Sequence, residues 1–323
     1  LNHYFCSMKK FLAVFFLVVL LKSKLVCADS LDIKIGQMIM IGMNGYAVKE
    51  SSPIVQAIKK NQVGGVLLFE LNLNPVNTQK TLAKLTADLQ AAARIPLLIS
   101  IDQEGGKVNR LKTKYGFKEM PSAKSIGLKN DDQYTVQTGV NTADALQACG
   151  ITINFAPVVD VDNPDCPVLS KLQRCYSANV QDIAHIAALI MDAHFEKDIR
   201  TAIKHFPGHG NSRTDSHKGL ADVSKYWTKE ELQPFKILID EGKVDAIMTA
   251  HIINRQLDES GLPATLSEKM VTNLLRKQLG YDGVVISDDM QMHAISSFYG
   301  FDESIKRAIN AGVDILIFSN NID

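Results

Sequence analysis

Residues 201–210 of this chain read Thr201-Ala202-Ile203-Lys204-His205-Phe206-Pro207-Gly208-His209-Gly210. The first three residues are typical of the end of a short buried strand. Pro207, Gly208 and Gly210 then exclude a helix, so the polar residues that follow the strand lie on a loop. Because catalytic side chains often lie on loops that a rigid scaffold holds, this strand and its loop are the first candidate for a functional site.

The same pattern of a short apolar run followed by a polar loop occurs eight times along the chain. The runs show no alternation of polar and apolar residues, which is typical of parallel strands buried on both faces. We expect strands at Gln37–Met43, Val63–Phe69, Pro96–Ile101, Ile151–Val159, Thr201–His205, Ala246–Ala250, Gly283–Ile286 and Asp314–Phe318.

Amphipathic stretches between these runs predict helices. Apolar residues recur about every 3.6 residues in Val180–Phe195, and similar patterns cover Asn77–Ala93 and a stretch from Ser267 to Gly280. We expect one α/β domain over residues 29–323, folded as a TIM (β/α)8-type barrel. A doubly wound sheet is the alternative. The chain stops just after the eighth apolar run, so the last helix of the barrel is expected to be missing.

The composition is that of an ordinary globular protein, with 46% hydrophobic and 22% charged residues. The formal net charge is zero, which gives no indication of nucleic acid or an anionic membrane as a partner. The sequence contains no basic stripe with interleaved aromatic residues, so nucleic-acid binding is not predicted.

The N-terminus predicts a signal peptide over residues 1–28. Met8-Lys9-Lys10 forms a positive segment, Phe11–Leu21 a short apolar run, and Val26-Cys27-Ala28 a small-residue cleavage site. We expect cleavage after Ala28 and a secreted or periplasmic protein with no stable membrane insertion. An uncleaved anchor is the alternative, although the run is shorter than the roughly 20 residues of a transmembrane helix. Cleavage would remove four lysines and no acidic residues, which changes the net charge from 0 to −4.

The chain after cleavage keeps three cysteines, Cys149, Cys166 and Cys175. Cys149 falls at the end of an apolar helical stretch and is expected to be buried. In an oxidising compartment Cys166 and Cys175 could pair and close a short loop. The odd number of cysteines leaves this pairing open.

The predicted strands end in polar residues, at the positions where the functional residues of a TIM barrel lie. Carboxylates, cations and imidazoles therefore converge on one mouth of the barrel, which suits the binding and cleavage of a polyhydroxylated ligand. The residues are Asp102, Glu104 and Arg110 after the third strand, Asp160, Asp162 and Arg174 after the fourth, Lys204 and His205 after the fifth, His251 after the sixth, and Asp288 and Asp289 after the seventh.

Several of these residues also have a structural interpretation. Asp160 and Asp162 could cap a helix or a loop. His251 could be a core histidine. Asp289 could cap the following helix while Asp288 faces the mouth. Three further histidines are expected on helices with structural roles, namely His185, His194 and His293.

His205 and His209 are four residues apart, a spacing that could suit a metal ion if both lay on a helix. Pro207 and Gly208 prevent the helix that would turn both rings the same way. We therefore predict no metal site.

Three segments resemble the motifs of family 3 glycoside hydrolases, in the β-N-acetylglucosaminidase (β-N-acetylhexosaminidase) branch with an Asp-His acid/base loop. Residues 204–210 together with Asp215-Ser216-His217 resemble the family signature. Residues 101–111 resemble its sugar-binding segment, and residues 286–290 resemble its nucleophile segment. The resemblance runs in the same order from about residue 31 to residue 323.

The resemblance implies a retaining mechanism through a covalent glycosyl-enzyme intermediate. Asp288 is then the nucleophile, and His217 is the acid/base that Asp215 orients. The loop that carries this pair is expected to close when sugar binds. No metal or organic cofactor is implied. The implied sugar-binding residues are Asp102, Arg110, Arg174, Lys204 and His205.

The chain departs from the family in two respects. The family usually has Arg-Ser-Phe where this chain has Arg174-Cys175-Tyr176. Many single-barrel members act in the cytoplasm on recycled cell-wall fragments, whereas a leader is expected here.

The resemblance implies a carbohydrate substrate, with removal of terminal non-reducing β-linked N-acetylglucosamine from peptidoglycan or muropeptide fragments. Three alternatives stay open: an N-acetylglucosaminide phosphorylase, a β-glucosidase or xylosidase, and a non-catalytic sugar-binding barrel.

Overall fold

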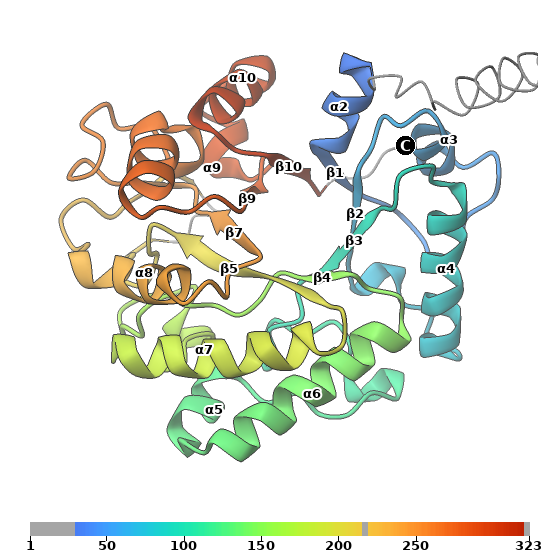
Figure 1. The fold of residues 1–323 in the computed structure, drawn as a ribbon, viewed down its shortest axis with the longest axis horizontal. Coiled ribbons are helices and arrows are strands. Elements are labelled where there is room, and N and C mark those ends of the chain that lie inside the picture. The colour runs from blue at the N-terminus through green and yellow to red at the C-terminus, as the bar shows by residue number, and fades with distance from the viewer. Residues whose placement is uncertain (1–29, 215–218, 320–323) are drawn as a thin grey trace, which may run out of the picture.

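The computed structural model describes residues 30–214 and 219–319. These residues form a closed barrel of parallel strands in the order β1-β10-β9-β7-β5-β4-β3-β2 (Figure 1). The barrel strands are β1 (Ile39–Gly42), β2 (Gly65–Leu68), β3 (Leu98–Ile101), β4 (Ile153–Asn154), β5 (Arg200–Phe206), β7 (Ala246–Thr249), β9 (Val284–Asp289) and β10 (Ile315–Phe318). The predicted TIM-type barrel is confirmed, and the doubly wound sheet is wrong because β1 pairs with both β2 and β10.

All eight predicted strands are present, but β4 is much shorter than the predicted run Ile151–Val159. Pro157 has no backbone N–H and cannot continue a hydrogen-bonded ladder. Pairing with β5 resumes only as an isolated bridge between Val158 and Lys204. The apolar run therefore correctly predicts that this segment is buried, but it overestimates the length of the hydrogen-bonded strand.

Helices cover the outside of the barrel (Figure 1). Two of the predicted helices coincide with α4 and α7, and the third is a π-helical segment, Lys269–Gln278. The α-helices are α2 (Leu31–Gln37), α3 (Pro53–Lys59), α4 (Thr78–Ala92), α5 (Ala123–Lys129), α6 (Asp132–Ala148), α7 (Val180–Phe195), α8 (Gln233–Asp240), α9 (His293–Ser296) and α10 (Phe301–Ala311).

The helix α7 shows how the sequence specifies these elements. The side chain of Asn179 accepts hydrogen bonds from the backbone N–H groups of Gln181 and Asp182, which caps the first turn. Ile183 and Ile190 lie on the buried face of the helix, against the barrel. This face is buried in the layer between strands and helices, which explains why apolar residues recur about every 3.6 residues in the sequence of this helix.

The barrel interior is filled with side chains. A cluster that includes Met40, Phe155, Met248 and Ile286 closes the inside of the barrel below its mouth. Larger clusters fill the layer between the strands and the helices. The barrel is therefore a packed core, and a ligand can reach it only at an open end.

A second sheet that the sequence pattern did not predict lies in the loops after β5 and β7. It pairs β6 (Ala221–Asp222) with β8 (Ile252–Ile253) in parallel. Strands of this length leave no periodic pattern in a sequence. Their side chains form a small apolar cluster with Trp227, which supports the loop that follows β5.

Cys149, Cys166 and Cys175 are buried free thiols. The predicted burial of Cys149 is confirmed, and the considered pairing of Cys166 with Cys175 is not found.

The predicted signal peptide, residues 1–28, lies outside the described residues. Within residues 30–214 and 219–319, no helix combines the length and apolar character needed to cross a bilayer.

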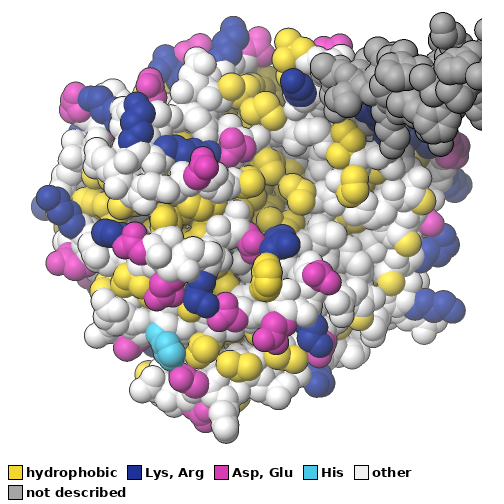
Figure 2. Space-filling view, viewed as in Figure 1, with side chains coloured by type: hydrophobic (Ala, Val, Ile, Leu, Met, Phe, Trp, Pro, Cys, Tyr) yellow, Lys and Arg dark blue, Asp and Glu magenta, His cyan; other side chains and the backbone are white. Residues whose placement is uncertain are grey.

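Charged side chains of both signs are interspersed over the face drawn in Figure 2.

Candidate active site

A pocket of about 380 Å³ opens at the carboxyl end of the barrel strands. This volume is in the range of pockets that hold small molecules, about 300–1,000 Å³. Apolar side chains, among them Phe69, Leu172 and Met292, form part of the wall. The polar lining residues are Asp102, Glu104, Arg110, Arg174, Lys204, His205, His209, Asp288 and Asp289.

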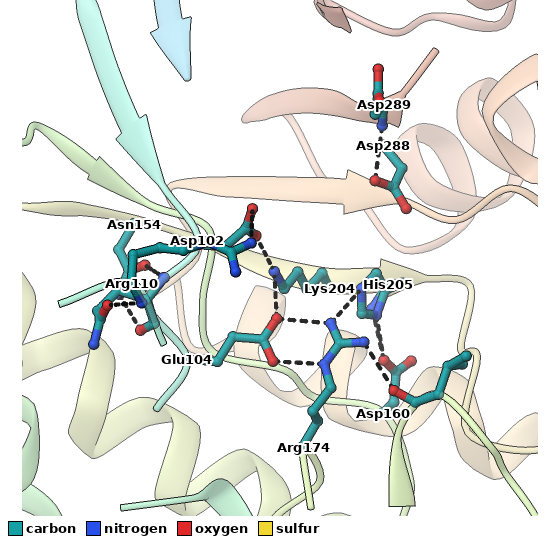
Figure 3. A network of polar contacts seen from close by, with 12 residues as sticks. Asp102, Glu104, Arg110, Asn154, Asp160, Arg174, Lys204, His205, Asp288 and Asp289 are labelled. Carbon is teal, nitrogen blue, oxygen red and sulfur yellow. Dashed lines mark hydrogen bonds and ion pairs between the residues drawn. The ribbon is translucent and has the colours of Figure 1, made fainter. Parts of the chain in front are cut away.

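The centre of the polar wall is Glu104, which binds two cations. Lys204 Nζ lies 2.8 Å from Glu104 Oε1 and 2.7 Å from Asp102 Oδ1. Arg174 binds the same carboxylate in a bidentate manner, through Nε at 2.7 Å and Nη2 at 2.8 Å (Figure 3). These contacts join residues from the ends of β3 and β5 and from the loop after β4 into one network.

Burial and charge act against each other in this network. Burial alone would raise the pKa of Glu104, but Arg174 and Lys204 hold that pKa well below its ordinary value. Burial alone would lower the pKa of Lys204, but Asp102 and Glu104 raise it. Glu104 and Lys204 are therefore both charged at neutral pH, and each depends on its oppositely charged partners for compensation.

A bulge at the end of β5 lets consecutive side chains face the pocket. The register of β5 against β7 shifts between Lys204 and Phe206. Successive side chains of a regular strand point to opposite faces. The irregularity at His205 allows both Lys204 and His205 to line the pocket.

Asp160 fixes the ring of His205. His205 Nδ1 lies 2.6 Å from Asp160 Oδ2, and His205 Nε2 lies 3.4 Å from Arg174 Nη2. Arginine only donates hydrogen bonds, so Nε2 is the acceptor and Nδ1 donates its proton to Asp160. The backbone N–H of His209 also donates to Asp160 Oδ1, at 2.7 Å. Asp160 therefore caps a loop, in line with one of the two interpretations of the sequence, and also orients a pocket residue.

Asp288 lies at the end of β9, across the pocket from the Glu104 network (Figure 3). Its Oδ1 accepts the backbone N–H of Asp289 at 2.8 Å. Asp289 itself accepts the backbone N–H groups of Gln291 and Ser319, each at 3.0 Å. Asp289 thus caps the turn before α9 and ties the end of β9 to the end of β10, while Asp288 faces the mouth.

Residues 30–322 match the description "Glycosyl hydrolase family 3 N terminal domain". The chain belongs to glycosyl hydrolase family 3.

Two curated relatives of this family 3 domain carry the name beta-hexosaminidase. Beta-hexosaminidase A of Pseudoalteromonas piscicida is 33% identical over 88% of this chain and 52% of the relative. The beta-hexosaminidase of Tolumonas auensis is 34% identical over 82% of this chain and 78% of the relative. The chain thus spans about half the length of the first relative and most of the second.

Two solved structures resemble this family 3 domain. A family 3 β-N-acetylglucosaminidase from Paenibacillus has a TM-score of 0.83 at 38% identity, over 90% of this chain and 55% of the other. NagZ from Neisseria gonorrhoeae, in complex with N-trifluoroacetyl-D-glucosamine, has a TM-score of 0.78 at 30% identity, over 88% of this chain and 81% of the other.

The family 3 domain brings six of the eight predicted site residues to one pocket. These are Asp102, Arg110, Arg174, Lys204, His205 and Asp288. Arg110 lies 3.9 Å from Asp102, between Nη2 and Oδ2. The other two, Asp215 and His217, lie outside the described residues, as does the predicted closure of their loop.

Two further pocket residues have no role that the sequence pattern predicts. Glu104 stands out in the sequence only as a polar residue at a strand end, and His209 only as part of a loop. Burial is the main cause that lowers the pKa of His209 to about 4, so its ring is neutral at neutral pH. The rings of His205 and His209 are 5.8 Å apart in an edge-on arrangement. Among the described residues, no group of three or more His, Cys, Asp or Glu residues is placed to hold a metal ion.

The histidines predicted to be structural lie on helices of the family 3 domain. His194 is buried, and burial lowers its pKa to about 4. His185 pairs with Asp132 at the surface, and His293 begins α9. His251 is a core histidine whose ring contacts Thr265 Oγ1 and the backbone oxygen of Asp289, each at 2.9 Å.

Proposed function

We propose that this family 3 domain is a retaining β-N-acetylhexosaminidase that releases terminal β-linked N-acetylglucosamine, with peptidoglycan fragments as the substrate. The observation that carries the proposal is Asp288 facing a sugar-sized pocket across from Glu104 and its two cations. The beta-hexosaminidase names of the curated relatives support the same reaction. So does the N-trifluoroacetyl-D-glucosamine held by NagZ of Neisseria gonorrhoeae.

The polar wall supplies both kinds of hydrogen-bonding group that sugar hydroxyls need. Asp102 can accept a hydroxyl proton, while Lys204 and Arg110 can donate to a hydroxyl oxygen. The ion pairs with Glu104 and Asp102 hold Lys204 in place before a sugar binds. A pocket of this size with one packed end suits a terminal residue of a glycan better than an internal one.

In the proposed reaction, Asp288 is the nucleophile and His217 is the acid/base. An Oδ atom of Asp288 attacks the anomeric carbon, and the bond to the leaving oxygen breaks as His217 donates a proton to it. Water then attacks the anomeric carbon, gives its proton to His217, and releases the carboxylate of Asp288. Asp215 orients the ring of His217 in this scheme. Two inversions at the anomeric carbon leave the product with the β configuration of the substrate.

We test the role of Asp288 with Asp288→Ala, assayed on an aryl β-N-acetylglucosaminide. The variant is expected to lose at least roughly 10³-fold in kcat, because it lacks the attacking oxygen. Asp289→Asn, next to it in sequence, is the control and is expected to retain the nucleophile and measurable turnover. Full activity of Asp288→Ala would contradict the mechanism.

The product of the wild-type reaction on purified muropeptides distinguishes the remaining alternatives. We expect free N-acetylglucosamine that appears first as the β anomer. A sugar phosphate that forms only when phosphate is added would establish a phosphorylase instead. Faster turnover of aryl β-glucosides or β-xylosides would assign the pocket to sugars without an acetamido group.

The location of the protein forms part of the proposal. The charged segment, apolar run and small-residue site at residues 8–28 support export, which would bring the domain to cell-wall material outside the cytoplasm.

A further inference from the structure

The turn after β5 is held between two buried carboxylates on different elements. On the pocket side, Asp160 Oδ1 accepts the backbone N–H of His209 at 2.7 Å. On the outer side, Glu231 Oε2 accepts the backbone N–H of Asn211 at 3.3 Å, and Glu231 Oε1 accepts Asn211 Nδ2 at 2.8 Å. Glu231 belongs to the short helix η4 (Lys229–Leu232) and is 1% exposed.

The turn also packs tightly against the segment that carries Glu231. A Cβ atom at Gly208 would lie 2.4 Å from Glu231 Cβ, so only glycine permits this approach. The backbone φ of Gly208 is +109°, which also favours glycine. Trp227 adds a second link, since its Nε1 donates to Pro207 O at 3.1 Å. Residues 227–231 thus pack directly behind the turn.

We infer that Glu231 is a positioning residue for acid catalysis, because it fixes Asn211 and so determines where the chain leaves the barrel toward Asp215 and His217. This inference rests on the proposed function, in which His217 is the proton donor. Asn211 lies four residues before Asp215 in the sequence. The described chain runs on from Asn211 to Thr214, so a shift of the turn at Asn211 would also shift the residue that directly precedes Asp215.

A buried carboxylate is a costly way to hold a turn if stability alone matters, because an apolar side chain of similar volume often stabilises a protein as well or better. The pKa of Glu231 is raised to about 7, mainly by burial and also by the nearby carboxylate of Asp160, while the hydrogen bonds from Asn211 oppose the shift. The carboxylate fixes the orientation of Asn211, since its two oxygens each accept one N–H group of that residue. A proton donor must be held at a defined position and orientation relative to the leaving oxygen.

The inference predicts a loss that depends on the leaving group. A sugar with a poor leaving group needs a well-placed acid, whereas an activated aryl group departs without much help. The nucleophile Asp288 lies on β9, whereas Glu231 lies behind the turn that follows β5. Removal of Glu231 should therefore affect the two kinds of substrate differently.

The test compares kcat/KM of Glu231→Ala and Asn211→Ala on an alkyl and on a dinitrophenyl β-N-acetylglucosaminide. We expect each variant to lose about tenfold more on the alkyl substrate than on the activated one. The double variant should lose little more than either single one, because both changes break the same contact. Glu231→Gln keeps the shape and one acceptor, and should recover part of the loss. Glu230→Ala, an exposed neighbour on η4, is the matched control.

Equal losses on both substrates, or independent losses in the double variant, would show that Glu231 acts only on general stability and would overturn the inference. His217→Ala is measured in parallel. If His217→Ala shows no leaving-group dependence, the proposed acid itself is wrong. If it does and Glu231→Ala does not, only the inference fails. Should Glu231→Ala not fold, Asn211→Ala decides the question from the other side of the contact.

Discussion

At the scale of single residues, the site is built on one buried carboxylate. Glu104 is 4% exposed at its side chain and compensates both Lys204 and Arg174. The backbone of the strand end is fixed as well, since Gln103 Oε1 accepts the N–H of Arg110 at 2.9 Å. A change at Glu104 should therefore disturb two cations at once.

Glu104→Gln is expected to lower the free energy of unfolding by about 3 kcal/mol, because it leaves buried positive charge without its partner. The pKa of Glu104 is depressed in the folded state, so its contribution is present above its ordinary value of 4.5 and declines as the pH falls toward the folded pKa. Urea denaturation at pH 7 and at pH 4 measures both effects. KM should rise as well, since Lys204 and Arg174 line the pocket.

Glu50→Gln is the control for this change, because Glu50 pairs with Lys59 at the surface and is 74% exposed at its side chain. We expect a cost of about 0–1 kcal/mol there. Equal destabilisation by the two variants would contradict the central role of Glu104.

At the scale of elements, the end of β5 and its turn are shaped by close backbone contacts. A Cβ atom at Gly210 would lie 2.2 Å from the backbone oxygen of Val161. The same turn carries the N–H groups that bind Asp160 and Glu231. The strand thus places Lys204 and His205, and its turn depends on glycine for the fit against the loop after β4.

Gly210→Ala is expected to destabilise the protein by about 1–3 kcal/mol, because the backbone of Val161 cannot yield as a flexible side chain would. Activity should fall too, since the turn must move away from Asp160. Thermal unfolding and kcat/KM on an aryl substrate measure the two effects.

Gly300→Ala provides the comparison, because Gly300 has open space around it and an ordinary φ of −61°. It should cost less than about 1 kcal/mol. Similar behaviour of both variants would mean that the contact with Val161 does not constrain the turn.

At the scale of the whole molecule, the barrel brings distant segments of the chain to one mouth. The backbone N–H of Leu316 donates to Met38 O, which joins the last described strand to the first part of the barrel. The described barrel begins with α2, whose first turn is capped by the side chain of Ser30.

The proposed leader, residues 1–28, ends just before this cap. We expect exported protein to begin at Asp29, because Val26-Cys27-Ala28 presents small residues to a signal peptidase. N-terminal sequencing of the exported protein identifies its first residue. An exported protein that keeps residues 8–28 would favour the uncleaved anchor.

The pattern of residues along the chain was enough to specify the barrel and the position of its chemistry. Non-alternating apolar runs predict buried parallel strands, and β5 lies at residues 200–206, over the predicted strand Thr201–His205. Because all parallel strands end at the same mouth, the polar residues after them had to converge, and Asp288 and Lys204 do.

Which of these residues bind one another follows only from the folded barrel. Glu104 and Arg174 are 70 residues apart, and Lys204 and Asp102 are 102 apart. The role of Glu231 could not be predicted, because a glutamate in a polar stretch of sequence gives no sign of burial. Such contacts depend on distances across the folded barrel and on exclusion of water, which no local pattern of residues records.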